Sequence, residues 1–563
     1  MSMQVDGGAV DEDVDVAIIG GGVNGTGVAR DLSLRGLKVA LMERHDLGFG
    51  ASGNSSGMIH GGPRYLLTTP GVTKSSCLDS GFIQKIAPHL LFRIPFLMPI
   101  MSGAHGRIMF ELFDAFFRAY DDFQPLKRGE PHTRLSVSDL LSLEPGLVGD
   151  MRGGMTFDEW GVDGARLCTM NAIDAMEHGA DVRVHARVTS VGKTPPNDGP
   201  PGSPRYVLRV EDALTGEVRR IRARAVVNAT GAWGPLTAAL GGLPTSSVKI
   251  RPAKGIHVVF DRRLSNYGLM TTAIDGRQVF LEPWQNMSVI GTTDDDYYGD
   301  LNDVRPTSEE VRYLVQGVAH IFPAVREARI VGTWAGVRPT LYSYGPNEDK
   351  VSREHAIVDH AADGAPGVYS MLGGKLASYR LFAEEMSDRL ARDLAPSSVC
   401  TTHTTPLPGG ERAASDVTLT RQGSITPVAA RRLIYRHGTR SARILERIVK
   451  RPAERAVVCA CEPVLEAEVR HAITAEMART VEDVGRRTRL GLGACGGMRC
   501  AVRCGQILEQ ELDLPAGTGL VQAKRFLIRQ ARARTVAMGP AQARQEALLL
   551  AEMDATMGRK ATS

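Results

Sequence analysis

The sequence predicts an α/β protein in which a Rossmann-like domain is interleaved with an α+β domain and followed by small helical domains. The first observation behind this prediction is a glycine-rich turn, Gly20, Gly22 and Gly25, between a strand-like and a helix-like segment. The second is a cluster of cysteines near the other end, where five of the eight lie within residues 459–504. The third is the length of 563 residues, which predicts two to four domains because it exceeds what one core usually serves.

Composition narrows the class of protein. The 43% hydrophobic and 23% charged residues are ordinary for a soluble globular protein, and a net charge of +4 is too small to predict a nucleic-acid partner. The first residues lack the order of a signal peptide, and no uncharged apolar run reaches membrane-spanning length. We therefore expect a cytoplasmic protein, at most peripheral on the cytoplasmic membrane, whose cysteines are reduced.

The N-terminal unit reads as a strand, a tight turn and a helix. Residues 14–19 (VDVAII) are typical of a buried strand, and residues 26–35 have a helical pattern. Between them, Gly20 permits the turn, Gly22 lets the backbone approach a pyrophosphate, and Gly25 lets the helix pack closely on the strand. The helix N-terminus favours a bound negative charge.

An acidic residue completes this unit. Residues 38–42 predict a second strand, and Glu43 ends it, where a carboxylate can accept hydrogen bonds from a ribose diol. An acid at this place favours a cofactor with an unphosphorylated ribose, namely FAD or NAD, over a cofactor whose ribose is phosphorylated. Residues 177–191 and 225–234 resemble later strands of the glutathione-reductase type of FAD domain, which favours FAD. Val188 and Gly231 lie in these two segments and are candidate cofactor contacts.

Longer motifs resemble the FAD-dependent glycerol-3-phosphate dehydrogenases. They are GASGNSSGMIHGGPRYL at residues 50–66, RPAKGIH at 251–257, GTTD at 291–294, GVRP at 336–339 and GGKLASYR at 373–380. The resemblance covers residues 14–511. With the C-terminal cysteines, the chain is similar to the A-subunit type of the anaerobic respiratory enzymes rather than to the single-subunit aerobic type.

This resemblance implies oxidation of sn-glycerol 3-phosphate to dihydroxyacetone phosphate by hydride transfer from C2 to the flavin. Arg64 and Arg338 match the family's phosphate-binding arginines, and Tyr65 adjoins the first of them. Lys375 matches the lysine beside the substrate hydroxyl, and His257 matches the proposed general base. A clamp of arginine and lysine is also what elementary chemistry expects around a phosphate.

The remaining cofactor contacts are expected in two loops. The hydroxyls of Ser52, Ser55 and Ser56 are expected to meet the pyrophosphate, although Ala51, Asn54 and Gly57 depart from the aerobic enzymes in this loop. His60 competes with His257 as the base, but the turn His60-Gly61-Gly62 is better suited to shape the backbone under the isoalloxazine. Gly374, Lys375 and Leu376 are the last candidate cofactor contacts.

The cysteine pattern predicts a metal centre. Cys459-x-Cys461, 33 intervening residues and Cys495-x4-Cys500 resemble a bacterioferritin-associated-ferredoxin (BFD-like) [2Fe–2S] domain. Four thiolates satisfy such a cluster. A structural zinc ion is the rival, because four cysteines also suit a tetrahedral site. Cys504 lies one helical turn after Cys500 and either substitutes for it or stays free.

Two rival functions stay open from the sequence. One is an amino-acid or 2-hydroxy-acid dehydrogenase of the same fold, and the other is an electron-relay subunit without turnover. Expected partners are glycerol 3-phosphate, flavin and iron–sulfur anchor subunits or membrane quinone, and a possible second copy of the chain.

We expect a flexible tail (1–13), a discontinuous FAD-binding domain (14–90, 160–250 and 330–395), a substrate domain (91–159 and 251–329), a helical linker domain (411–455), a [2Fe–2S] domain (456–512) and a helical tail (513–563).

Overall fold

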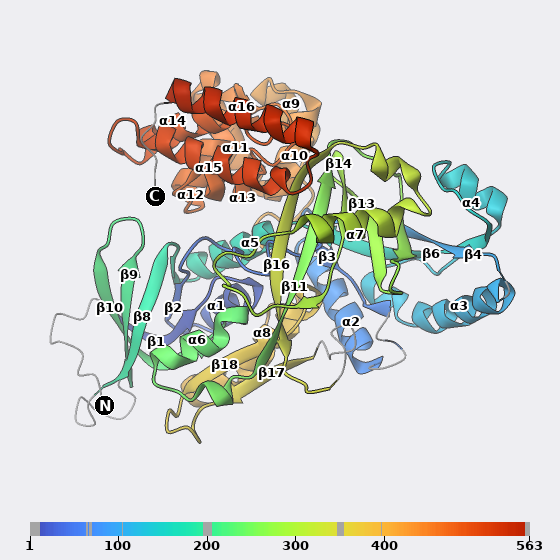
Figure 1. Cartoon of the computed structure of the whole chain (residues 1–563). Coiled ribbons are helices and arrows are strands. Elements are labelled where there is room, and N and C mark those ends of the chain that lie inside the picture. The colour runs from blue at the N-terminus through green and yellow to red at the C-terminus, as the bar shows by residue number, and fades with distance from the viewer. Residues whose placement is uncertain are drawn as a thin grey trace.

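The structure, a computed structural model, describes residues 12–557 except residues 64–65, 67–69, 104, 195–204, 346–353 and 396. Figure 1 shows two sheets, with the C-terminal helices (orange to red) gathered over the upper ends of β14 and β16. Among the described residues, no helix is both long and apolar enough to cross a membrane.

The first sheet is the predicted nucleotide-binding type. Its strand order is β17-β18-β10-β1-β2-β7, with β9 and β8 extending from β10. Strands β2 and β10 both pair in parallel with β1, so their carboxyl ends meet at one edge, where open α/β sheets bind ligands. The strands are β1 (Glu12–Ile19), β2 (Val39–Met42), β7 (Asp181–Arg183), β8 (Ala186–Lys193), β9 (Tyr206–Asp212), β10 (Val218–Asn228), β17 (His355–Asp359) and β18 (Val368–Gly373).

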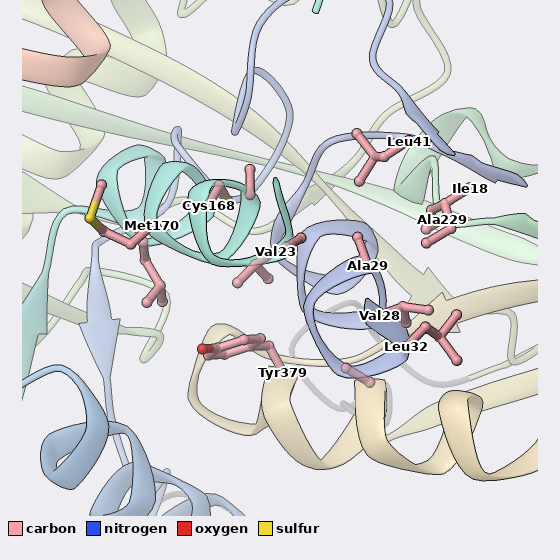
Figure 2. Close-up of a cluster of buried hydrophobic side chains, with 14 of the residues drawn as sticks. Ile18, Val23, Val28, Ala29, Leu32, Leu41, Cys168, Met170, Ala229 and Tyr379 are labelled. Atoms are coloured by element: carbon pink, nitrogen blue, oxygen red, sulfur yellow. The ribbon is translucent and has the colours of Figure 1, made fainter. Parts of the chain in front are cut away.

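Three helices pack together beside this sheet: α1 (Val23–Leu34), α5 (Gly164–Glu177) and α8 (Tyr379–Leu394). Figure 2 shows their shared core, in which Val28 and Leu32 of α1, Met170 of α5 and Tyr379 of α8 are buried. A Cβ at Gly27 would lie only 3.0 Å from Ala383 Cβ, so α1 and α8 approach closely. This packing fixes the N-terminus of α1 at the ligand-binding edge.

The second sheet is mostly antiparallel, with the order β15-β11-β14-β13-β12-β4-β6-β3, β16 on β11 and β5 on β6. Strand β16 pairs with β11 along its whole length, so residues 330–341 extend this sheet, although the expected FAD-binding segment began at residue 330. The strands are β3 (Met58–Ile59), β4 (Leu91–Met101), β5 (Arg134–Leu135), β6 (Met151–Val162), β11 (Ile250–Phe260), β12 (Gly268–Thr272), β13 (Gln278–Trp284), β14 (Met287–Gly291), β15 (Asp295–Asp296) and β16 (Ile330–Leu341).

The two faces of the second sheet are covered differently. On one face, Ile256 and Val258 of β11 pack in a core with Leu314 and Val318 of α7 (Ser308–Ala319). Because side chains alternate along a strand, His257 points to the opposite face. The remaining helices before the C-terminal region are α2 (Pro70–Ile86), α3 (Gly106–Asp121), α4 (Val137–Leu143) and α6 (Gly234–Leu240), the last of which packs on β8, β10 and β18 of the first sheet.

The C-terminal region forms two small cores. Helices α9 (Asp416–Gly423), α10 (Pro427–His437) and α11 (Ser441–Lys450) enclose one of them. The second joins Cys459, Cys500 and Cys504 to Phe526 and Met553, so the predicted tail packs on the cysteine region. Its elements are β19 (Val457–Cys459), β20 (Val464–Leu465), α12 (Glu466–Ala475), α13 (Val481–Thr488), α14 (Ala501–Glu511), α15 (Thr518–Thr535) and α16 (Pro540–Met557).

Candidate functional site

A cavity of about 800 Å³ lies between the carboxyl edge of the first sheet and the inner face of the second. Its volume is within the range of small-molecule and cofactor sites. It brings together residues that the sequence predicted as FAD contacts and residues that it predicted as substrate contacts. Those lining it are Gly20, Gly22, Glu43, Ser52, Ser55, Ser56, His60, Gly62, Val188, Gly231, His257, Arg338, Gly374, Lys375 and Leu376.

At the nucleotide end, glycines shape the wall and one carboxylate marks it. Gly25 does not line the cavity, because it packs against the turn: a Cβ there would lie 2.0 Å from the Gly20 carbonyl oxygen. Glu43 accepts hydrogen bonds from the backbone N–H of Gly21 (2.7 Å) and of His45 (2.8 Å). Burial raises the pKa of the Glu43 carboxyl. The two backbone hydrogen bonds hold the Glu43 oxygens in place at the cavity wall, as is required of an acid that binds a ribose.

The serine loop between the two sheets is held by its own hydroxyls. Ser52 Oγ accepts a hydrogen bond from the Val23 N–H (3.0 Å) in the first turn of α1. Ser55 Oγ accepts from the Gly57 N–H (3.2 Å), and Ser56 Oγ lies 3.0 Å from His257 Nε2. The loop therefore connects the helix N-terminus to the candidate base.

The turn His60-Gly61-Gly62 is supported by a buried charged group, Glu159, which also lines the cavity. The Gly61 N–H donates to Glu159 Oε2 (3.2 Å), and Glu159 also pairs with Lys127 Nζ (2.7 Å). A Cβ at Gly61 would lie 2.3 Å from Tyr120 Oη, so Gly61 stands against this support and not at the cavity surface. Glu159 and Lys127 were not predicted from the sequence, since residues 32 positions apart give no local signal of contact.

His257 occupies the substrate end of the cavity. Its ring stacks on Trp334 (centroids 5.0 Å apart), and its Nδ1 is buried without a hydrogen-bond partner among the described residues. Burial, with a smaller contribution from the Arg338 charge, lowers the pKa of His257 to about 3. The imidazole is therefore neutral at physiological pH and can accept a proton.

Two predicted cations share this end of the cavity. Arg338 Nη1 donates to Asp294 Oδ1 (3.0 Å) and Nη2 to Thr292 Oγ1 (3.0 Å), which orients the guanidinium beside His257. Lys375 follows the turn Gly373–Gly374, whose φ angles of +75° and +87° favour glycine, and its Nζ is buried. Arg64 and Tyr65 lie outside the described residues.

An apolar wall faces these polar groups. Met270, Phe280, Phe96 and Phe157 line the cavity and come from neighbouring strands of the second sheet. They were not predicted as site residues, because alternating strand residues read as ordinary core. A cavity with a glycine-rich phosphate-binding edge, a fixed acid and one apolar wall fits FAD, whose flavin is flat and aromatic.

The cysteine sulfurs lie in two pairs. The Cys500 thiol donates to the Gly497 carbonyl oxygen (3.7 Å), and its interaction with Cys459 lowers the pKa of Cys459 and raises that of Cys500. Cys461 and Cys495 form the second hydrogen-bonded pair, and burial raises the pKa of Cys461. Cys504 is buried beside them, and burial together with the charge of Cys459 raises its pKa.

Across the part of the chain that the structure describes, three or more potential metal ligands lie within 4.8 Å of one another at one place, His437, His471 and Glu476. There Arg166 pairs with Glu476 and with His437 Nδ1 (2.9 Å), so the group is satisfied by protein contacts. The sulfurs of the C-terminal cysteines, all on described residues, do not form such a set of three.

Comparison with known proteins agrees with this geometry. Residues 15–380 match the family model of FAD dependent oxidoreductases, and residues 400–516 match the C-terminal domain of alpha-glycerophosphate oxidase. The A subunit of the anaerobic glycerol-3-phosphate dehydrogenase of Escherichia coli (strain K12) is 32% identical over 516 residues, which are 91% of each chain. Glycerol-3-phosphate dehydrogenase 1 of Mycobacterium tuberculosis (strain ATCC 25618 / H37Rv) is 33% identical over 512 residues, covering 86% of this chain and 92% of that protein.

A solved structure supports the fold. The glycerol-3-phosphate dehydrogenase from Bacillus halodurans, complexed with FAD, superimposes with a TM-score of 0.71 over 94% of this chain and 96% of that one, at 23% identity. Fold, nucleotide motif and sequence identity agree along nearly the whole chain. The chain belongs to the FAD-dependent oxidoreductase family, among the glycerol-3-phosphate dehydrogenases that resemble the A component of the anaerobic enzyme.

Proposed function

We propose that this chain oxidises sn-glycerol 3-phosphate to dihydroxyacetone phosphate with FAD and passes the electrons through an iron–sulfur cluster to a respiratory acceptor, quinone. The observation that carries the proposal is the position of Arg338, Lys375 and His257 in one cavity with the nucleotide motif. A small phosphoester alcohol needs cations for its phosphate and a proton acceptor for its hydroxyl. The relatives named above, which carry this activity in their names, support the same substrate.

Bound FAD supplies the electron acceptor for the substrate carbon. The protein's task is then to orient the substrate and to take its hydroxyl proton. Arg338 is fixed by Asp294 and Thr292, so its guanidinium is pre-organised for a phosphate and loses little conformational entropy on binding. Arg64 and Tyr65 are proposed to complete this clamp.

His257 is proposed as the general base, with His60 as the competing candidate. In the structure, burial and the Arg338 charge lower the pKa of His257. A bound phosphate dianion offsets that charge and so favours the protonated imidazole, which is what proton acceptance requires. Ser56 holds Nε2, and this contact fixes the ring orientation.

Cys459, Cys461, Cys495 and Cys500 are proposed as ligands of a [2Fe–2S] cluster. Their unequal spacing in the sequence, C-x-C and C-x4-C, supports iron over a structural zinc ion. Cys504 stands outside both pairs and is proposed to stay free. Onward transfer is proposed through flavin and iron–sulfur anchor subunits or directly to quinone, with the chain peripheral on the cytoplasmic membrane. The exposed side chains Ile108 and Leu112 of α3 are consistent with such a contact.

The test is a visible and EPR spectrum of anaerobically purified protein before and after glycerol 3-phosphate is added. We expect bleaching of the flavin band and the appearance of a reduced-cluster signal. Bleaching by a 2-hydroxy acid or an amino acid instead would assign the rival dehydrogenase. Zinc in place of iron, or no response to any of these substrates, would refute the proposal.

Single-cysteine variants test the ligand set. Cys461→Ser is expected to abolish the cluster signal and lower the iron content, whereas Cys504→Ser is expected to keep both. Cys400→Ser is the matched control, because Cys400 lies outside the C-terminal cluster. Loss of iron in Cys504→Ser but not in Cys500→Ser would reassign the fourth ligand.

A further inference from the structure

One side chain bridges the wall of the cofactor cavity and the loop that carries Cys495. Trp284, at the end of β13, is 8% exposed and belongs to a small apolar core with Val259, Met287, Val289 and Val331. Ala494, the residue before Cys495, packs against the same core. The tip of the β13–β14 hairpin therefore reaches the cysteine loop.

The indole also touches the cavity wall. A Cβ at Gly57 would lie 2.5 Å from Trp284 Cη2, so the ring lies directly on the backbone of the loop in which Ser56 and Met58 line the cavity. Trp334, which stacks on His257, lies 6.3 Å from Trp284 between ring centroids. The apolar core that contains this indole therefore contacts both the cavity wall and the residue before Cys495.

We propose that Trp284 is the contact through which single electrons pass from the flavin cavity to the cysteine-bound cluster. This inference rests on the proposed function, because it assumes a cluster on the cysteine pairs. Electron tunnelling weakens steeply across unfilled space, and a closely packed conjugated ring keeps the path continuous. A [2Fe–2S] cluster held by these cysteines would take one electron at a time, so the outside acceptor would reoxidise it before the second passage.

The electron balance closes with an acceptor outside the chain. Two passages remove the two electrons that one substrate molecule delivers, and an acceptor of the quinone class takes both together with two protons. Trp284 is not itself oxidised on this path. The guanidinium of Arg489 lies 5.6 Å from the centre of its ring, and a positive charge there disfavours removal of an electron from the indole.

The test compares Trp284→Leu and Trp284→Phe with the wild type in rapid-mixing experiments. Flavin bleaching by glycerol 3-phosphate and cluster reduction are followed separately, the second by freeze-quench EPR. In Trp284→Leu we expect unchanged iron content, an unchanged dithionite-reduced signal and unchanged flavin bleaching, but cluster reduction slower by about an order of magnitude. Trp284→Phe, which keeps an aromatic ring, is expected to lose less.

Trp160→Leu is the matched control. This indole packs against the core that α1, α5 and α8 share, and it donates a hydrogen bond to the Lys127 carbonyl oxygen (3.0 Å). It is expected to keep the wild-type rate of cluster reduction. Should Trp284→Leu fail to hold iron, Trp284→Met, which fills the space with an unbranched chain, replaces it in the same comparison. Wild-type cluster reduction in the leucine or methionine variant overturns the inference.

A second reduction method separates this inference from the proposed substrate. The flavin is reduced by light with a sacrificial amine, so no substrate turnover is involved. Slow cluster reduction in Trp284→Leu under light, combined with no bleaching by glycerol 3-phosphate in the wild type, would overturn the substrate and retain the electron path. A wild-type protein without iron would overturn the path together with the cluster.

Discussion

Buried charges serve two different purposes in the cofactor cavity and at the interface between the first sheet and the C-terminal region. At the interface, Asp46 accepts two hydrogen bonds from Arg487 (2.6 and 2.7 Å) and one from Arg486 (2.9 Å). Arg166 likewise binds both oxygens of Glu476. Each of these two interface carboxylates is therefore paired with an arginine of the protein itself.

In the cavity, the polar groups are oriented, and His257 keeps a position for a further hydrogen bond among the described residues. The described hydrogen bonds of Arg338 go to one carboxylate oxygen and to the neutral oxygens of Thr293 and Thr292. His257 keeps one ring nitrogen without a hydrogen bond among the described residues. A site that leaves capacity for hydrogen bonding can bind a ligand, whereas a saturated cluster can only hold the structure together.

The largest expected effect is on stability, from Asp46→Asn. This change removes the charged partner of the buried Arg487 guanidinium, whereas the partly exposed Arg486 keeps Asp483 nearby (3.6 Å). Breaking a buried ion pair costs about 3–5 kcal/mol of unfolding free energy. We expect a lower urea midpoint and faster release of FAD, because Asp46 lies in the loop after Glu43. The substrate KM of the remaining folded enzyme is expected to be unchanged. A wild-type urea midpoint would contradict the structural role assigned to the interface.

Arg338→Ala is expected to have the converse effect. Loss of a charged contact to a phosphate costs about 2–5 kcal/mol of transition-state stabilisation, which is roughly 30-fold to several thousand-fold in kcat/KM. Stability is expected to change less than in Asp46→Asn, because the Arg338 side chain is 29% exposed. Flavin bleaching rates at varied glycerol 3-phosphate measure the effect, with the exposed Arg262→Ala as the control. Wild-type kcat/KM in Arg338→Ala would remove it from the phosphate clamp.

The same contrast explains what the sequence could and could not predict. The nucleotide unit was predictable because strand, glycine turn, helix and Glu43 follow one another within one βαβ segment. The pairing of β16 with β11 was not, because residues 330–341 and 250–260 meet only through the folded sheet. Interface charges such as Asp46 and Arg487 are separated by 441 positions, so local patterns cannot reveal them.

A smaller effect is expected from the pH dependence that His257 gives to stability. Its pKa is about 3 in the folded protein against 6.5 for an ordinary histidine, so only the unfolded chain binds this proton between those values. The contribution of His257 to stability is therefore complete above pH 6.5 and is lost as the pH falls toward 3. His257→Asn should lessen the slope of the unfolding free energy against pH by up to about 1.4 kcal/mol per pH unit.

Urea unfolding at several pH values measures this slope. An unchanged slope in His257→Asn would mean that the imidazole is solvated or already charged in the folded protein. Either outcome would place it in a different environment from the one that a neutral proton acceptor requires.

The smallest effect is expected from Asp303→Asn, which isolates burial as the cause of the contrast. Asp303 and Arg305 are paired at 2.6 Å, the same distance as Asp46 and Arg487, but their side chains are 56% and 61% exposed. Solvent screens such a pair, so its loss should change the unfolding free energy by no more than about 1 kcal/mol. If the two aspartate variants were equally destabilised, the ion-pair geometry would set the energy. A large difference in urea midpoint would assign the energy to the buried setting of Asp46 together with its second arginine and its additional hydrogen bonds, because the shortest distance and the residue types are the same.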